Sequence, residues 1–149
     1  MSEHKATIAW ERQGIDFAYK AYPRNHTWTF ENGSTLPVSA AVQFHGDPNC
    51  VDPEQAFVAS LASCHLLTFL AMASFQKLTI NRYVDHAVGH LAQNAAGKWV
   101  ISRVDLYPKI EFAEGVEPTR EQLEQLHRKA HQECFLANSV TCEIVTHIE

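Results

Sequence analysis

Four cysteines carry most of the chemical potential of this chain. Cys50, Cys64, Cys134 and Cys142 are spread over 149 residues, too few and too far apart for a disulfide scaffold. In a reducing compartment a structural bridge is not expected either. A free cysteine is usually a small buried hydrophobe, whereas its thiolate is a nucleophile. Each of the four is therefore expected to be either a core residue or a reactive thiol.

Two of the cysteines fall on predicted helices. Cys64 lies near the middle of an apolar run over residues 56–73, and Cys134 ends the apolar stripe of a helix predicted to start at Thr119. If the two helices pack together, the thiols could face one another. A disulfide would then require a Cα separation of roughly 4.4 to 6.8 Å. Cys142 falls on the apolar face of a predicted strand and Cys50 in a loop, so both are weaker candidates.

A metal site is the competing interpretation. His127, His131 and Cys134 stand at i, i+4 and i+7, which places them near one face of the second helix. However, there is no paired C-x-x-C motif, and nine histidines make chance matches easy. His86 and His90 fall in a predicted strand and suggest no site. A metal-binding module built on His127, His131 and Cys134 stays an alternative.

The N-terminal third is predicted to be an antiparallel meander. Apolar and polar residues alternate around Ile8, over 17–21 and around Trp28, and each of these stretches is followed by a turn signal. Asn32-Gly33 is a typical hairpin sequence. Another strand is expected within 36–44.

The first predicted helix is unusually apolar. Asp52 can cap it, Pro53 suits its first position, and Glu54 favours the positive end of its dipole. Residues 56–73 contain no Asp, Glu, Lys or Arg, which meets the lower length limit for a membrane span. Internal polar residues, the lack of cationic flanks and the strand-rich context favour a core helix instead.

The second half completes an α+β pattern. Strands are predicted over 83–92 and 99–112, separated by a turn at 94–97. Thr119 and Gln122 form a capping box for a second helix that is expected to reach about Ala137. Alternation around Cys142 predicts a final strand. The sequence thus predicts one α+β domain over 1–149, with two main helices and antiparallel sheets.

The net charge argues against one class of function, and the N-terminal residues indicate the compartment. The net charge is −5 and the 12 Lys and Arg residues are scattered, which argues against a nucleic-acid surface. The first ten residues contain no apolar signal segment, so a cytoplasmic protein is expected.

Two segments of the chain resemble those of a known family. Asp52-Pro53-Glu54 followed by the run Ala59 to His65 is similar to the segment around the reactive cysteine in OsmC/Ohr proteins. The run from Ala130 to Phe135, with Asn138-Ser139-Val140 after it, resembles the second-cysteine segment of that family. The order of strands, helix, strands, helix and strand also agrees.

The resemblance implies a thiol-dependent peroxidase that works as an intertwined homodimer with the reactive-Cys helices in its centre. Cys64 would attack a hydroperoxide, Cys134 would resolve the sulfenic acid, and a dithiol or protein thiol would reduce the disulfide. Arg24, or alternatively Arg12, would favour the thiolate, and Glu54 would hold that guanidinium. No metal or organic cofactor is implied. A stress-response or binding protein with little turnover stays an alternative.

Helix geometry adds a condition to this scheme. Ten residues on one continuous helix separate Glu54 from Cys64 by roughly 15 Å. Either the helix begins after Glu54, or each site combines Cys64 of one chain with Glu54 of the other.

Overall fold

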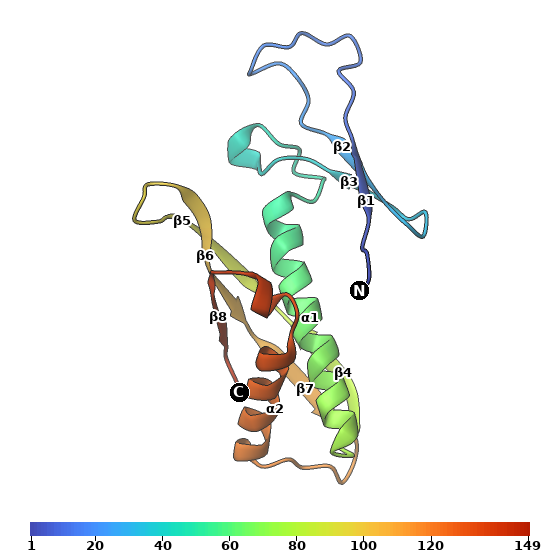
Figure 1. The fold of residues 1–149 in the computed structure, drawn as a ribbon, viewed down its shortest axis with the longest axis vertical. Coiled ribbons are helices and arrows are strands. Elements are labelled where there is room, and N and C mark those ends of the chain that lie inside the picture. Colours follow the sequence, from blue (N-terminus) through green and yellow to red (C-terminus); the bar gives the residue numbers. More distant parts are fainter. The chain divides into compact units, whose positions relative to one another are not determined.

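The computed structural model describes all residues, 1–149, as two compact units (Figure 1). The first unit comprises Met1–Ala56 and the second Phe57–Glu149. The helix α1 (Pro53–Phe75) begins at the end of the first unit and provides the long helix of the second. Helices and antiparallel sheets together confirm the predicted α+β class.

The first unit contains a three-stranded antiparallel sheet. Its strands β1 (Ala6–Ala9), β2 (His26–Phe30) and β3 (Thr35–Val38) lie in the order β1-β2-β3, which confirms the predicted meander. Gly33 adopts a φ of 84° in the tight turn between β2 and β3, a conformation that favours glycine.

One strand prediction in this unit was wrong, and another strand is shorter than predicted. The segment between β1 and β2 is a long loop, because the Ala21 N–H turns back to the Ala18 carbonyl oxygen at 2.8 Å and so cannot join a ladder. Its alternating aromatic residues pack on one another instead, with the rings of Phe17 and Tyr22 5.0 Å apart. The strand expected within 36–44 ends at Val38 and is followed by a short 3₁₀ helix, η1 (Val42–Phe44).

The start of α1 follows from its sequence. The Gln55 N–H donates to Asp52 Oδ1 at 2.8 Å, and the Asp52 N–H donates to Gln55 Oε1 at 3.2 Å. This reciprocal pair caps two N–H groups that have no partner within the helix. The buried face of α1 then repeats every fourth residue, at Leu61, His65, Phe69 and Ala73.

The second unit contains two separate sheets. In one, β4 (Ile80–Asp85) pairs with β7 (Pro108–Phe112); in the other, β6 (Trp99–Leu106) lies between β5 (Val88–Gln93) and β8 (Glu143–Thr146). The two strands predicted at 83–92 and 99–112 are therefore each divided, the second one just before Pro108, which cannot donate to a ladder. Pairing is antiparallel except between β6 and β8, which are parallel.

The helix α2 (Arg120–Glu133) has the predicted capping box at Thr119 and Gln122. It ends earlier than expected, since Cys134 is extended, and a 3₁₀ turn, η2 (Ala137–Ser139), precedes β8. Within the second unit α2 lies beside α1, and Phe69 and Ala73 of α1 pack on Leu126 and Ala130 of α2 (Figure 1). A second core cluster joins Leu61 to the central strand β6.

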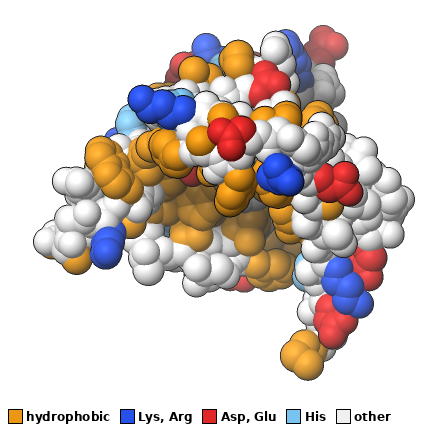
Figure 2. Space-filling view, turned by 90° about the horizontal axis from the view of Figure 1, so that it is seen from above, with side chains coloured by type: hydrophobic (Ala, Val, Ile, Leu, Met, Phe, Trp, Pro, Cys, Tyr) orange, Lys and Arg blue, Asp and Glu red, His pale blue; other side chains and the backbone are white.

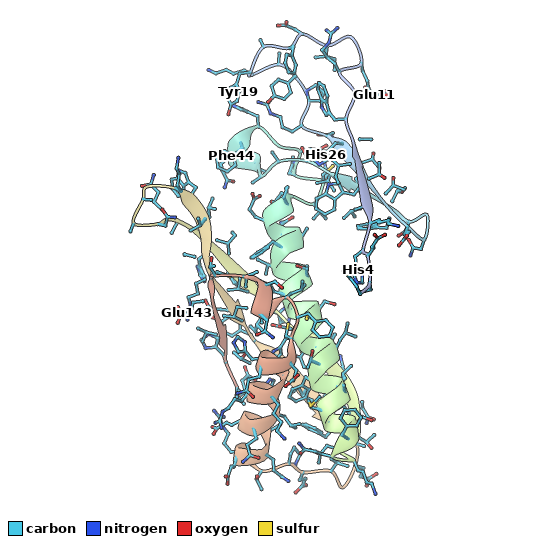
Figure 3. All side chains as sticks on the ribbon, in the orientation of Figure 1. His4, Glu11, Tyr19, His26, Phe44 and Glu143 are labelled. Carbon is cyan, nitrogen blue, oxygen red and sulfur yellow. The ribbon has the colours of Figure 1, made fainter.

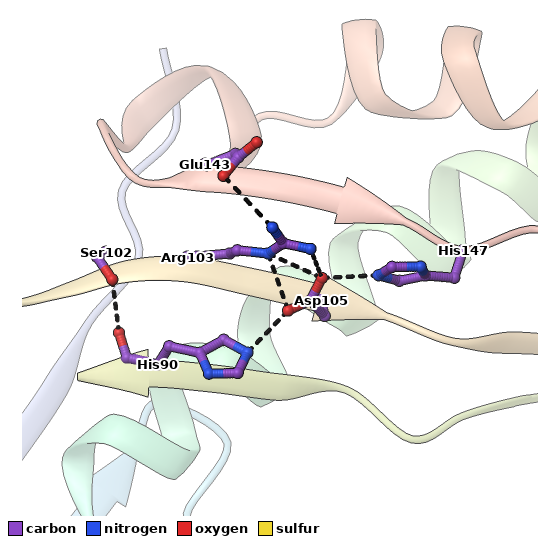
Figure 4. Close-up of polar contacts among 6 residues, drawn as sticks. All are labelled: His90, Ser102, Arg103, Asp105, Glu143 and His147. Atoms are coloured by element: carbon purple, nitrogen blue, oxygen red, sulfur yellow. Dashed lines mark hydrogen bonds and ion pairs between the residues drawn. The ribbon is translucent and has the colours of Figure 1, made fainter. Parts of the chain in front are cut away.

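A buried carboxylate fixes the end of the chain to the sheet (Figure 4). Asp105 on β6 is 3% exposed and accepts hydrogen bonds from Arg103, from His90 Nε2 at 2.8 Å and from His147 Nε2 at 2.7 Å. The hydrogen bond from the Arg103 guanidinium and, to a smaller extent, the one from His147 hold the pKa of Asp105 well below its usual range. Because His147 directly follows β8, this cluster secures the parallel strand, a structural role that the sequence did not reveal.

Candidate functional site

The structure brings Cys64 and Cys134 into contact. The two are free thiols, and Cys134 Sγ donates to Cys64 Sγ at a separation of 2.6 Å. They are 70 residues apart in sequence, so only the packing of α1 against α2 makes them neighbours. Two free thiols in contact are the arrangement in which a sulfenic acid on one sulfur can condense with the other to form a disulfide.

The local structure differs at the two thiols. Cys64 lies in the middle of a continuous helix and is half-buried. Cys134 directly follows the last residue of α2, with an extended backbone (φ −72°, ψ 113°), and is 1% exposed. The backbone N–H of Ala137 donates to Cys134 Sγ at 3.4 Å. Cys64 is thus the more accessible thiol and Cys134 the enclosed one.

Burial also sets the protonation of the second thiol. Desolvation raises the pKa of Cys134, and its contact with Cys64 adds to the effect. Cys134 therefore keeps its proton at neutral pH and serves as the donor in the pair. Cys64 is the acceptor of this hydrogen bond.

The other two cysteines have different surroundings. Cys50 belongs to the loop before α1, where Asn25 Nδ2 lies 3.9 Å from its sulfur, and burial followed by the charge of Asp47 raises its pKa. Cys142 precedes β8 and packs against the second core cluster, and burial raises its pKa too. Neither has the features of an activated thiol.

The alternative metal site is not formed. His127 is buried and bonded to another histidine, whereas His131 is exposed on the next turn of α2. No group of three or more His, Cys, Asp or Glu side chains is arranged to hold a metal ion. The regular helical spacing of the three residues was therefore misleading, because His127 and Cys134 are buried while His131 faces solvent.

Both candidate arginines bond within their own loop. Arg24 donates to the backbone carbonyl oxygens of Tyr19 and Tyr22, the latter at 2.6 Å, and its guanidinium carbon lies 3.8 Å from the ring centroid of Tyr22. Tyr19 is labelled in Figure 3 on this loop. Arg12 donates to the Ile15 carbonyl oxygen at 2.9 Å.

Within one chain, Glu54 does not hold the guanidinium of Arg24 as expected. Arg24 makes no ion pair with Glu54, so the predicted holding pair is absent. Since α1 begins at Pro53, Glu54 and Cys64 also lie on one continuous helix, ten residues apart. The option that the helix begins after Glu54 was therefore wrong.

Sequence reasoning missed a polar pair beside the thiols. His65 Nε2 and His127 Nδ1 are 3.0 Å apart and join α1 to α2 in the core. The signal was present, because His127 lies on the inward stripe of the second helix, four residues after Leu123 and seven before Cys134. A histidine on such a stripe needs a buried partner, and His65 on the apolar helix was available.

The sequence model of the family described as OsmC-like protein matches residues 46–149. The chain belongs to the OsmC-like family. Both contacting thiols lie inside the matched segment, and Arg24 and Arg12 lie outside it. No curated protein matches the chain.

Solved structures show the same fold. An OsmC-like protein of unknown function from Vibrio cholerae is 44% identical, with a TM-score of 0.95 and full coverage of both chains. An organic hydroperoxide resistance protein OsmC from Legionella pneumophila has 19% identity and a TM-score of 0.72. The match covers 99% of this chain and 98% of the Legionella chain. The organic hydroperoxide resistance protein OhrB of Bacillus subtilis has 18% identity, a TM-score of 0.71 and the same coverage. At such identities the last two show the fold alone, and this OsmC-like chain shares it throughout.

Proposed function

We propose that this protein is a thiol-dependent peroxidase that reduces organic hydroperoxides. The contact between Cys64 Sγ and Cys134 Sγ at 2.6 Å carries the proposal, in a chain of the OsmC-like family. The names of the Legionella and Bacillus structures, which refer to resistance to organic hydroperoxides, support the choice of substrate. The cytoplasm is the proposed compartment.

The reaction has three steps. The Cys64 thiolate attacks the distal peroxide oxygen, the O–O bond breaks, and the alcohol leaves after taking up a proton, so that Cys64 becomes a sulfenic acid. The Cys134 thiol then attacks the Cys64 sulfur, which forms the disulfide and releases water. A dithiol or protein thiol finally reduces the disulfide by exchange and becomes oxidised itself. Two electrons pass in all from the reductant to the peroxide.

The direct test is consumption of an alkyl hydroperoxide by purified protein with a dithiol reductant. Turnover that needs both peroxide and dithiol supports the peroxidase. Stoichiometric oxidation without turnover, even with several dithiols, would favour the alternative of a stress-response or binding protein of the same fold.

Cys134 is predicted to protect Cys64 from overoxidation. In the wild type, a single equivalent of peroxide should give an intrachain Cys64–Cys134 disulfide. In Cys134→Ser no thiol stands beside the sulfenic acid, so excess peroxide should convert Cys64 to sulfinic and sulfonic acid. Peptide mapping by mass spectrometry distinguishes these products. A bridge from Cys64 to Cys50 in the wild type would contradict the assignment.

Arg24 is proposed to favour the Cys64 thiolate, and its two bonds to carbonyl oxygens leave other guanidinium N–H groups free to reach a sulfur. Arg24→Ala should slow the peroxide step more than it slows reduction of the disulfide. Arg24→Lys should recover part of the rate, since an ammonium keeps the charge and loses the planar fork. The measurement is the rate of Cys64 alkylation against pH. A change in Arg12→Ala and none in Arg24→Ala would move the role to Arg12.

A homodimer is the proposed functional unit. Along α1, residues 60, 63, 67, 70 and 74 are exposed at alternating spacings of three and four, and Leu67 is 64% exposed on a helix without charge after Glu54. Figure 2 shows hydrophobic side chains gathered on one face of the molecule. A second copy of α1 would cover the stripe, and could place its Glu54 near the first chain's Cys64, a position Glu54 cannot reach on its own helix.

Light scattering is expected to show a dimer at assay concentration. Leu67→Glu places a charge in the proposed dimer interface and should give monomers with reduced peroxidase activity. Lys129→Gln, on the exposed face of α2, changes the net charge by the same amount and should leave the dimer intact. An active monomer would contradict the proposal.

A further inference from the structure

Besides the thiol contact, a single side-chain hydrogen bond joins α1 to α2. It runs between His65 Nε2 and His127 Nδ1 at 3.0 Å, and the two ring planes lie within 5° of parallel. His65 is 2% exposed and His127 4% exposed. Phe69 covers the second ring, with its centroid 4.4 Å away. The pair is therefore enclosed and its rings are held in place by packing.

The bond is between two neutral rings. Burial lowers the pKa of each histidine to about 4, so at neutral pH one ring donates and the other accepts. A hydrogen bond weakens steeply with angle and distance. The apolar contacts around it, between Phe69 and Ala73 on one helix and Leu126 and Ala130 on the other, have no such directionality. The histidine bond is therefore a directional contact between the two helices, in addition to the thiol contact.

This bond lies close to the thiols on both helices. His65 directly follows Cys64 on α1. His127 precedes Cys134 by seven residues, which is about two helical turns and roughly 10 Å along the same face of α2. A disulfide tolerates only a narrow range of Cα and Cβ separations. A shift of α2 against α1 by a fraction of a turn would therefore separate the sulfurs.

We propose that His65 and His127 are positioning residues for the resolving step. Their bond sets the register of α2 against α1 at which Cys134 Sγ meets Cys64 Sγ. The proposal rests on the proposed function only in naming Cys134 as the resolving thiol. Neither histidine takes part in the chemistry, because their bond to each other is buried in the core.

The test measures how readily the two thiols pair, in a background in which Cys50 and Cys142 are serine. In buffers of reduced and oxidised glutathione, both thiols give up their hydrogens and one glutathione disulfide becomes two glutathione thiols. The equilibrium constant reports the effective concentration of one thiol toward the other. Since no peroxide is involved, the result reports on the relative position of the two thiols even if the protein does not reduce hydroperoxides.

In the double variant His65→Leu, His127→Leu both polar partners are removed, so the core keeps its stability while the directional bond is lost. Its equilibrium constant should fall by about 5- to 10-fold, because helices without the directional bond also adopt registers in which the two sulfurs are apart. Its thermal midpoint should stay near that of the background protein. An unchanged constant in this folded variant would overturn the proposal.

Two further substitutions test position rather than polarity. His127→Asn places an amide where Nδ1 lies and should keep the equilibrium constant near that of the background, whereas His127→Gln carries the same amide one methylene farther and should lower it. Equal constants for the two would overturn the proposal, whether or not the leucine variant folds. His131→Gln, on the exposed face one turn later, is the matched control, and a decrease there as large as in His127→Gln would overturn it as well.

Discussion

Cys64→Ser is expected to abolish hydroperoxide consumption while the fold is retained. Serine nearly preserves the size of the side chain in a half-buried site, so packing around α1 should change little. A serine hydroxyl is a weak nucleophile without a neighbouring base, and none is bonded to this position, so the O–O bond should not be attacked at a useful rate. The residual rate should equal the background reaction between dithiol and peroxide.

The matched control is Cys142→Ser. Cys142 is also partly buried, yet it packs in the second core cluster and burial raises its pKa, so its replacement should leave peroxide consumption at the wild-type level. Circular dichroism and the thermal midpoint establish that both variants are folded. Full activity of Cys64→Ser, or its loss in Cys142→Ser instead, would assign the nucleophile to a different cysteine.

The sequence predicted those elements that have local signals. The capping sequences at Asp52 and at Thr119 give the start of both helices correctly. The Asn32-Gly33 turn and the alternation around it predict the hairpin of the first unit. These features depend on residues within a few positions of each other, which is why one sequence suffices to find them.

The errors come from contacts between distant residues. The aromatic residues around Phe17 alternate as in a strand, yet they pack on each other in a loop. The strand β8 pairs in parallel with β6, next to a hydrogen bond between Asp105 and His147, which are 42 residues apart in sequence. The same holds for the candidate site. Its cysteine motifs can be recognised in the sequence, whereas the partner of His127 cannot. That each site takes residues from two chains stays a prediction.

Acid is expected to destabilise the protein between about pH 6.5 and pH 4. The pKa of His65 and of His127 is lowered to about 4 in the folded protein, chiefly by burial, while an unfolded histidine titrates near 6.5. In this interval the unfolded chain binds more protons than the folded one, so the free energy of unfolding decreases as the pH falls. The interval corresponds to at most about 3 kcal/mol per histidine. For the pair this is a large part of a typical domain's stability.

Two carboxyl groups with shifted pKa values do not add to this loss of stability. Burial raises the pKa of Asp85, so just above the usual carboxyl value the folded protein binds its proton more readily than the unfolded chain, which opposes the loss. Asp105 has a lowered pKa, so the stability that it contributes is present above about pH 4, the usual carboxyl value, and is lost only below it. Urea unfolding at pH 7.5 and pH 5 should show a marked decrease in the wild type. The decrease should be much smaller in the double variant His65→Leu, His127→Leu, whose core has no histidine to protonate. His131 lowers the pKa of His65 only as a secondary cause after burial, so His131→Gln should retain most of the wild-type decrease. Parallel losses in all three proteins would show that the buried pair does not set the acid limit.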